Sequence, residues 1–143
     1  MSDYTIRYAK AEDVPLLQEV DTRPKEEAWQ RKIDALEVVV AVAERPETLI
    51  VGHLRFSVLW STAPFLGTIF VAPEHRGQGL SRQLLSFLEA ELKERGYAAL
   101  LSSSQTDEPE PQRWHTHMGF RLGGIIEHNP DNDVGEVVYK KML

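Results

Sequence analysis

The sequence predicts a mixed α/β fold around one sheet, in the order β-α-α-β-β-β-α-β-α-β-β. Apolar residues alternate in some segments and recur at helical spacing in others, and the two kinds of segment interleave along the chain. A further observation sets the scale, because 143 residues with 42% hydrophobic content suit one core rather than two. We therefore expect a single domain over residues 1–143.

The first part of the chain predicts one strand and two helices. Thr5–Ala9 has the pattern of a strand. Asp13 is expected to cap a short helix that carries Pro15 in its first turn. A second helix follows the turn at 21–24 and places three apolar side chains at helical spacing, those of Trp29, Ile33 and Leu36.

The middle of the chain predicts three strands and the longest helix. The strands are expected at Val38–Ala43, Ile50–Trp60 and Gly67–Val71. Alternation in the second strand places four side chains on one side, those of Leu54, Phe56, Val58 and Trp60. We expect both Trp29 and Trp60 to lie in the core. The helix from Gln78 to Arg95 should present one apolar stripe, formed by Leu80, Leu84, Leu88 and Leu92.

The last part of the chain predicts three more strands and a short helix. Tyr97–Ser103 is expected to be a strand, and a polar acidic stretch then leads to a helix near Gln112–Met118. Two strands complete the sheet, at Phe120–His128 and Gly135–Leu143, around a turn rich in Asn and Asp.

Composition excludes several functional classes. The net charge of -6 argues against nucleic acid as a partner, because proteins that bind phosphate backbones concentrate Lys and Arg. The absence of cysteine excludes disulfides, thiolate metal sites and a cysteine nucleophile. The first residues lack a signal-peptide pattern, and the longest apolar run, Val38–Ala43, is too short to span a bilayer. We expect a cytoplasmic protein with no membrane partner.

The most informative segment is the turn between the strand ending at Val71 and the long helix. Gly77 and Gly79 let an anion approach the backbone closely, and the first N–H groups of a helix favour negative charge. Arg76 and Arg82 add positive charge. The segment predicts a diphosphate site, although an ordinary strand–turn–helix corner would also place glycines there. The Walker A and Rossmann spacings are both absent.

This segment resembles the acetyl-CoA-binding motif of the GNAT N-acyltransferase superfamily. In that motif a strand ending Val-x-Pro-Glu leads through Arg-Gly-x-Gly-x-Gly/Ala into a long helix. Residues 76–80 match, and Ser81 stands where Gly or Ala is usual. Two further segments support the resemblance, Gly52-His53-Leu54 and Met118-Gly119-Phe120.

The resemblance implies acetyl-CoA as cosubstrate and a role for each part of the motif. The pyrophosphate would bind to the backbone of the turn and first helical residues, namely Arg76, Gly77, Gln78, Gly79, Leu80, Ser81 and Arg82. The pantetheine amides would pair with Ile69, Phe70 and Val71, and the Val71 N–H would polarise the thioester carbonyl as an oxyanion donor.

The proton-transfer residues depart from the family pattern. Relatives often carry a Tyr five residues before the Phe of the Gly-Phe pair, and His115 stands at that position here. We predict His115 as the general acid, against the alternative that it only packs or caps. The base is left open. Gly67 stands where relatives often carry a carboxylate, and a water chain to Glu74, Asp107 or Glu108 is one alternative.

Two histidines and three acidic residues are the candidates for a metal site and an acceptor site. His115 and His117 point to different faces of a helix, so we expect no metal. Asp107 and Glu108, together with Glu110, would steer a cationic acceptor by electrostatics, or form only a solvated loop.

Two functional classes result. The first is an N-acetyltransferase that moves an acetyl group from acetyl-CoA to a primary amine of a small molecule or peptide, by direct sequential transfer. The second is a non-catalytic CoA-binding module. Pairing of sheet edges could also give a homodimer. The acceptor and the acyl-chain length are not readable from the sequence.

Overall fold

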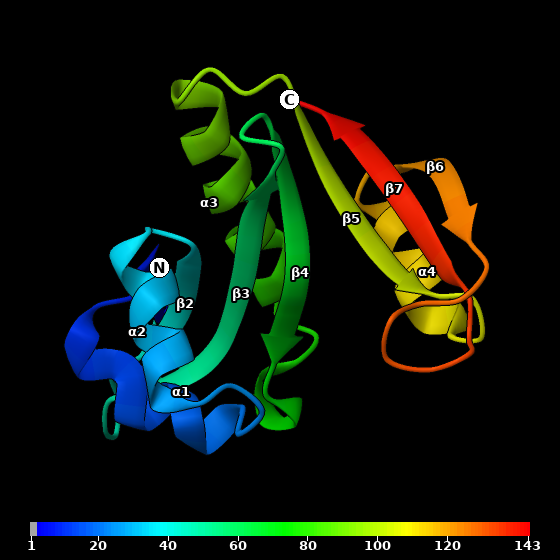
Figure 1. Ribbon diagram of the computed structural model, residues 1–143. Coiled ribbons are helices and arrows are strands. Elements are labelled where there is room, and N and C mark those ends of the chain that lie inside the picture. Colours follow the sequence, from blue (N-terminus) through cyan, green and yellow to red (C-terminus); the bar gives the residue numbers. More distant parts are fainter. Residues whose placement is uncertain (1–2) are drawn as a thin grey trace. The chain divides into compact units, whose positions relative to one another are not determined.

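The computed structural model describes residues 3–143, and its element order is the predicted one. The described residues form seven strands, four α-helices and two short 3-10 turns, η1 and η2. Figure 1 shows how these elements follow one another along the chain. Their bounds are β1 Tyr4–Tyr8, η1 Ala11–Asp13, α1 Val14–Val20, α2 Glu26–Asp34, β2 Val38–Ala43, β3 Leu49–Leu59, β4 Ala63–Val71, η2 Pro73–His75, α3 Leu80–Glu94, β5 Ala99–Gln105, α4 Pro109–His117, β6 Arg121–Ile126 and β7 Glu136–Met142.

The strands form one mixed sheet in the order β1-β2-β3-β4-β5-β7-β6. Strands β4 and β5 are parallel, whereas β1–β2, β2–β3, β5–β7 and β6–β7 are antiparallel. The β4–β5 register comprises two pairs, Phe65 with Leu101 and Leu66 with Ser102. Strand β4 continues for five residues beyond the last of these pairs, to Val71. The mixed α/β class predicted from the sequence is confirmed.

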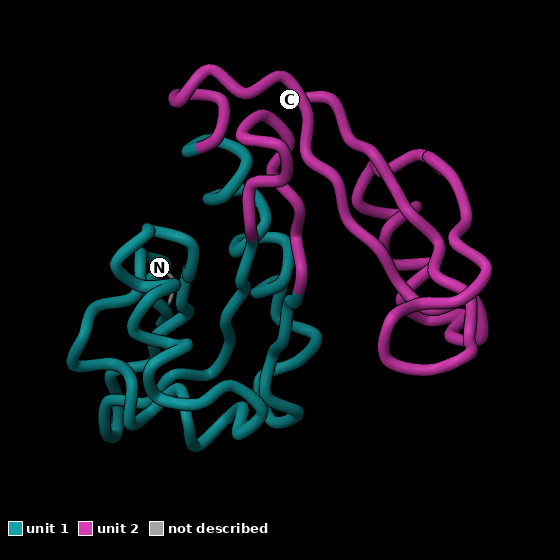
Figure 2. Tube along the Cα trace, in the orientation of Figure 1, with its two compact units in different colours: residues 1–56, 68–91 teal, residues 57–67, 92–143 magenta. Residues whose placement is uncertain are grey.

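Contacts divide the chain into two compact units, which Figure 2 colours separately. Unit 1 comprises residues 1–56 and 68–91, and unit 2 comprises residues 57–67 and 92–143. The prediction of a single domain over the whole chain stays a prediction.

Helices of unit 1 lie against both faces of β3. Neighbouring residues of a strand point to opposite faces, so Gly52 and His53 show which helix covers each one. A side chain at Gly52 would meet Leu84 of α3 at 3.4 Å, whereas the ring of His53 lies 5.5 Å from that of Trp29 on α2. Every residue of β2 is buried between these layers. The predicted leucine stripe of α3 is confirmed, and its members are at most 2% exposed: Leu80, Leu84, Leu88 and Leu92.

Unit 2 packs α4 against strands β5 and β7. Strand β5 alternates in burial, with Leu100, Ser102 and Ser104 buried, which is the period-2 pattern of a strand with one covered face. From β7, Tyr139 stacks on His115 of α4 at 4.1 Å between ring centroids. The buried residues of this unit therefore include polar groups that must pair with one another.

One predicted helical position, Leu36, and one predicted core position, Trp60, are wrong. Helix α2 ends at Asp34, and Leu36 takes a left-handed φ of 57° with 49% of its surface exposed. Trp60 lies in the β3–β4 hairpin with a φ of 55° and is 80% exposed. In both cases the periodic spacing of apolar residues in the sequence continues beyond the last residue of the helix or strand. Trp29 is fully buried, as predicted.

Two element starts and one helix cap also differ from the prediction. Strand β4 begins at Ala63 instead of Gly67, and α4 begins at Pro109, a residue suited to a first helical turn. Asp13 precedes α1 but makes no side-chain cap. Its carboxylate instead accepts bonds from Arg7 at 2.7 and 3.0 Å and from the Lys10 N–H at 2.7 Å.

Within the described residues, no helix has the length and apolar character needed to cross a membrane.

Candidate functional site

The predicted diphosphate turn joins the end of β4 directly to the long helix α3. Gly77 and Gly79 take positive φ values of 77° and 78°, a backbone conformation that side chains disfavour. A Cβ at either position would have no heavy atom within 4 Å. The glycines are therefore required by the path of the backbone rather than by neighbouring atoms, and the space beside them is open.

Main-chain donors gather at this turn. The Gln83 N–H bonds to the Gly79 carbonyl at 3.0 Å, which begins the hydrogen-bond ladder of α3. The N–H groups before it have no carbonyl one turn earlier in the helix to reach. Leu80 is 2% exposed and anchors the helix start in the core of unit 1. The exposed donors and the helix dipole together make this a fitting place for an anion.

Side chains brace the turn from both sides. The Tyr4 hydroxyl lies 2.9 Å from His75 Nδ1 and donates to Gln78 Oε1 at 2.8 Å. Arg76 folds back along β4, where its Nε donates to the Val71 carbonyl at 2.8 Å and its guanidinium lies 5.9 Å from the Phe70 ring centroid. Sequence reasoning missed Tyr4, because nothing in a local pattern links residues 71 positions apart.

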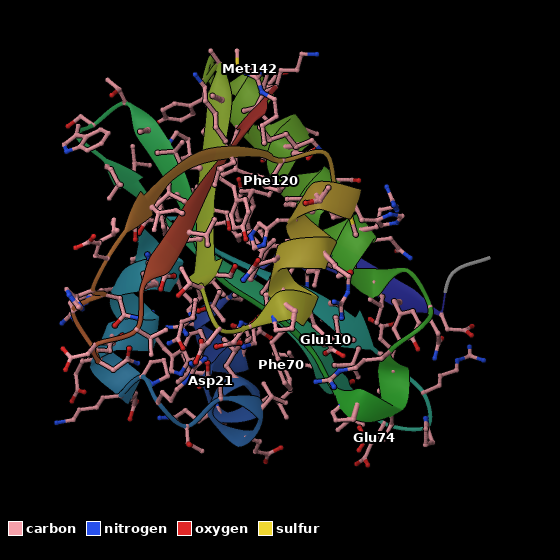
Figure 3. The ribbon with its side chains drawn as sticks, turned by 90° about the vertical axis from the view of Figure 1, so that its right-hand side faces the viewer. Asp21, Phe70, Glu74, Glu110, Phe120 and Met142 are labelled. Carbon is pink, nitrogen blue, oxygen red and sulfur yellow. The ribbon has the colours of Figure 1, made fainter. Side chains whose placement is uncertain are left out.

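Residues predicted for the cofactor all lie in unit 1, in one stretch. Ile69, Phe70 and Val71 are half-buried at the end of β4. Glu74, one of the alternatives for the base, is exposed in η2 and is labelled in Figure 3. The residues predicted for the acid and the acceptor lie in unit 2.

His115 is 5% exposed and both of its ring nitrogens are engaged. Nδ1 lies 2.7 Å from the Pro111 carbonyl, which can only accept, so Nδ1 carries the proton. Nε2 lies 2.7 Å from Ser102 Oγ. Burial lowers the pKa of His115, although the bond to Pro111 opposes this effect. The single hydrogen of Ser102 Oγ has two acceptors in reach, His115 Nε2 at 2.7 Å and the Leu66 carbonyl at 3.3 Å. With Nδ1 protonated, the neutral imidazole accepts this hydrogen at Nε2, the nearer acceptor, and has no proton to give there.

The acidic residues predicted near the acceptor occupy the start of α4. Asp107 and Glu108 are exposed and precede the helix, and Glu110 lies in its first turn. Within the described chain no group of three or more His, Cys, Asp or Glu side chains could hold a metal ion.

A second polar cluster, which sequence reasoning did not find, lies in unit 1 on the face of β3 that carries α2. Asp21 (labelled in Figure 3) accepts two side-chain bonds from Arg23, both at 2.9 Å, and one from Arg55 at 3.2 Å. The bonds from Arg23 lower the pKa of Asp21 to about 2, against the opposing effect of burial. His53 is fully buried, with Nε2 3.8 Å from this carboxylate.

Comparison with protein families decides the assignment. Residues 5–120 match the acetyltransferase (GNAT) family. The chain belongs to the GNAT acetyltransferase family. It is thus an N-acetyltransferase, as the sequence predicted. Among proteins of curated function, none matches this sequence.

Solved structures of GNAT proteins share this fold at low sequence identity. Ard1 from Thermoplasma volcanium is 13% identical, with a TM-score of 0.83 over 99% of each chain. The ribosomal-protein-S18-alanine N-acetyltransferase from Escherichia coli is 19% identical, with a TM-score of 0.78 over 97% of this chain and 93% of that one. A GNAT family acetyltransferase from Elizabethkingia anophelis, with acetyl-CoA bound, is 18% identical, with a TM-score of 0.77 over the whole of both.

Proposed function

We propose that this acetyltransferase takes its acetyl group from acetyl-CoA and transfers it directly to a primary amine of a small molecule or peptide. The observation that carries the proposal is the left-handed Gly77–Gly79 turn, which leaves open space beside the backbone at the start of α3. A GNAT neighbour has been solved with acetyl-CoA bound, which supports the donor. The Escherichia coli neighbour is named for acetylation of a protein alanine, which supports a peptide as one kind of acceptor.

The chain's own groups fit coenzyme A in two places. The pyrophosphate would be bound by the N–H groups of residues 77–82, with Arg82 adding charge at the exposed first turn of α3. Pantetheine would pair with the main chain of residues 69–71, at the end of β4 beyond its register with β5. Acetyl-CoA supplies an activated thioester, and the Val71 N–H would bond its carbonyl oxygen as negative charge develops there.

Proton transfer is the second part of the proposal. As general acid, His115 would have to protonate a thiolate, yet its surroundings hold it neutral with Nδ1–H bonded to Pro111. The base is open, with Glu74, Asp107 and Glu108 as candidates through water. With no cysteine in the chain, a thioester-linked acyl-enzyme on cysteine is excluded, which favours direct attack by the amine.

The experiment that tests the proposal pairs two measurements on the same protein. Calorimetry with CoA measures binding at the turn, and thiol release from acetyl-CoA over a panel of amines and peptides measures transfer. We expect CoA binding and acceptor-dependent thiol release, with the acetylated amine identified by mass spectrometry. CoA binding without thiol release from any acceptor would favour the non-catalytic module. The absence of CoA binding would overturn the assignment of the turn.

A further inference from the structure

Unsatisfied buried nitrogens concentrate at one place in unit 1. Among the described residues, the buried side-chain nitrogens without a hydrogen-bond partner are Trp29 Nε1, His53 Nδ1 and Nε2, and Arg55 Nε. The three residues contact one another, because the His53 ring lies 5.5 Å from that of Trp29 and the Arg55 guanidinium lies 5.1 Å above it. Buried polar atoms are rarely left unpaired, so this concentration indicates a site for a hydrogen-bond acceptor.

A cavity of about 350 Å³ lies beside this cluster. Its walls come from α2, from the segment before it, and from β3. The lining residues are Pro24, Ala28, Trp29, Arg31, Lys32, Glu37 and Arg55. The volume suits a part of a small organic molecule. The indole of Trp29 gives the cavity an apolar wall, so its occupant is expected to have a carbon skeleton as well as a polar end.

The charge of the cavity is positive once its internal ion pairs are taken into account. Lys32 donates to Glu37 at 3.1 Å and also to the Phe56 carbonyl. The positive charge of Lys32 is therefore balanced by the negative charge of Glu37. Arg55 shares Asp21 with Arg23, which already binds both carboxylate oxygens.

Two guanidinium groups of the cavity, those of Arg31 and Arg55, therefore carry positive charge that is not fully balanced by a carboxylate. Arg31 is exposed and, within the described chain, has no ion pair. Arg55 is half-buried, and its Nη1 forms no hydrogen bond to the described residues. A planar carboxylate is the group that guanidinium forks bind best.

We propose that this cavity binds a carboxylate group carried by the acetyl acceptor, held by Arg55 and Arg31 with the carbon chain against Trp29. The inference rests on the proposed function, because it names the chemical class of the acceptor: a molecule with a primary amine at one end and a carboxylate at the other.

The distance from the cavity to the reacting end of β4 sets the length of that molecule. Arg55 Nη2 donates to Thr68 Oγ1 at 3.1 Å, so the guanidinium lies beside β4. Val71 follows three residues later, which is about 10 Å along a strand. An amine at the thioester and a carboxylate at Arg55 must span most of this distance. An α-amino acid that reacts at its α-amine is too short, whereas a side-chain amine like that of lysine, or the N-terminus of a short peptide, is long enough.

The test compares matched acceptors that differ only in charge: 6-aminohexanoate and its amide. In the parent protein we expect kcat/KM to be about 10- to 100-fold higher for the acid, the range for a charge-assisted pair. In Arg55→Gln and in Arg31→Gln this preference should fall towards 1. Arg45→Gln, an exposed position outside the cavity, removes the same charge and should keep the preference.

A second measurement needs no turnover. The acetylated product, 6-acetamidohexanoate, should raise the melting temperature of the parent and not that of Arg55→Gln, with acetate and inorganic phosphate at the same concentration giving no rise that depends on Arg55. Arg31→Gln alters only an exposed side chain, so it tests the site even if Arg55→Gln folds poorly. Product stabilisation without transfer to any acceptor would sink the proposed function alone. Equal kcat/KM for acid and amide, or no stabilisation by the product, would overturn the carboxylate site. A rise with acetate or phosphate that Arg55→Gln removes would assign the cavity to free anions instead.

Discussion

His53 should make the protein's stability depend on pH between about 4 and 6.5. The side chain is fully buried and neither ring nitrogen has a partner. Burial lowers its pKa from 6.5 to about 4, with further lowering by Arg55 and Arg23 and an opposing effect of Asp21. The unfolded chain therefore binds a proton at this residue before the folded chain does.

The sign and size of the effect follow from linkage. The contribution of neutral His53 is complete above pH 6.5 and is lost as the pH falls towards 4. Between pH 7 and pH 4.5 the free energy of unfolding should fall by about 2.5 kcal/mol from this residue alone. Asp21 does not contribute in this window, because its folded pKa of about 2 places its loss of stability at lower pH.

The perturbation is His53→Leu, which keeps an apolar side chain against Trp29 and removes the titrating group. Urea unfolding at pH 7, 6, 5 and 4.5 gives the difference in unfolding free energy between parent and variant, which cancels groups common to both. That difference should shift by about 2.5 kcal/mol in favour of the variant as the pH falls. A parent–variant difference that stays constant within about 1 kcal/mol would refute the reasoning.

Three further predictions concern the cofactor turn and α4. Removing the Tyr4 hydroxyl with Tyr4→Phe should weaken CoA binding about 3- to 10-fold in calorimetry with kcat unchanged, and an unchanged affinity would contradict the bracing role. Gly77→Val and Gly79→Val each force a side chain into a left-handed backbone, which costs about 1–2 kcal/mol and should weaken CoA binding at least tenfold. His115→Phe removes the bonds of the imidazole to Ser102 and to the Pro111 carbonyl and should lower the free energy of unfolding by about 1–3 kcal/mol while kcat stays within a few-fold. A loss of kcat beyond a hundredfold in a folded variant would instead support the general-acid prediction.

The parts of the fold that sequence predicted are those set by local periodicity. The leucine stripe of α3 repeats every four residues, so its buried face was readable from the sequence. The predictions for Leu36 and Trp60 were wrong although they rest on the same periodicity as the leucine stripe. Each residue continues the period of its segment, but the backbone turns left-handed there, and periodicity does not report where an element ends.

The candidate site divides in the same way. The Gly77–Gly79 turn was predictable because its glycines, strand end and helix start are consecutive. The surroundings of His115 on α4 were not predictable, since they depend on Ser102 of β5 and Tyr139 of β7. The cluster around Trp29 was equally hidden. Its partners come from residues 21 to 55, and only the folded chain brings their charges and unpaired nitrogens together.

The division into two units has a practical consequence for anyone who tries to dissect the protein. Each boundary falls inside a regular element: after Phe56 within β3, after Gly67 within β4, and after Glu91 within α3. Neither unit is thus a continuous segment of the chain, and no single truncation produces one of them whole. A fragment library should return insoluble pieces, and heating the whole chain should give one melting event rather than two.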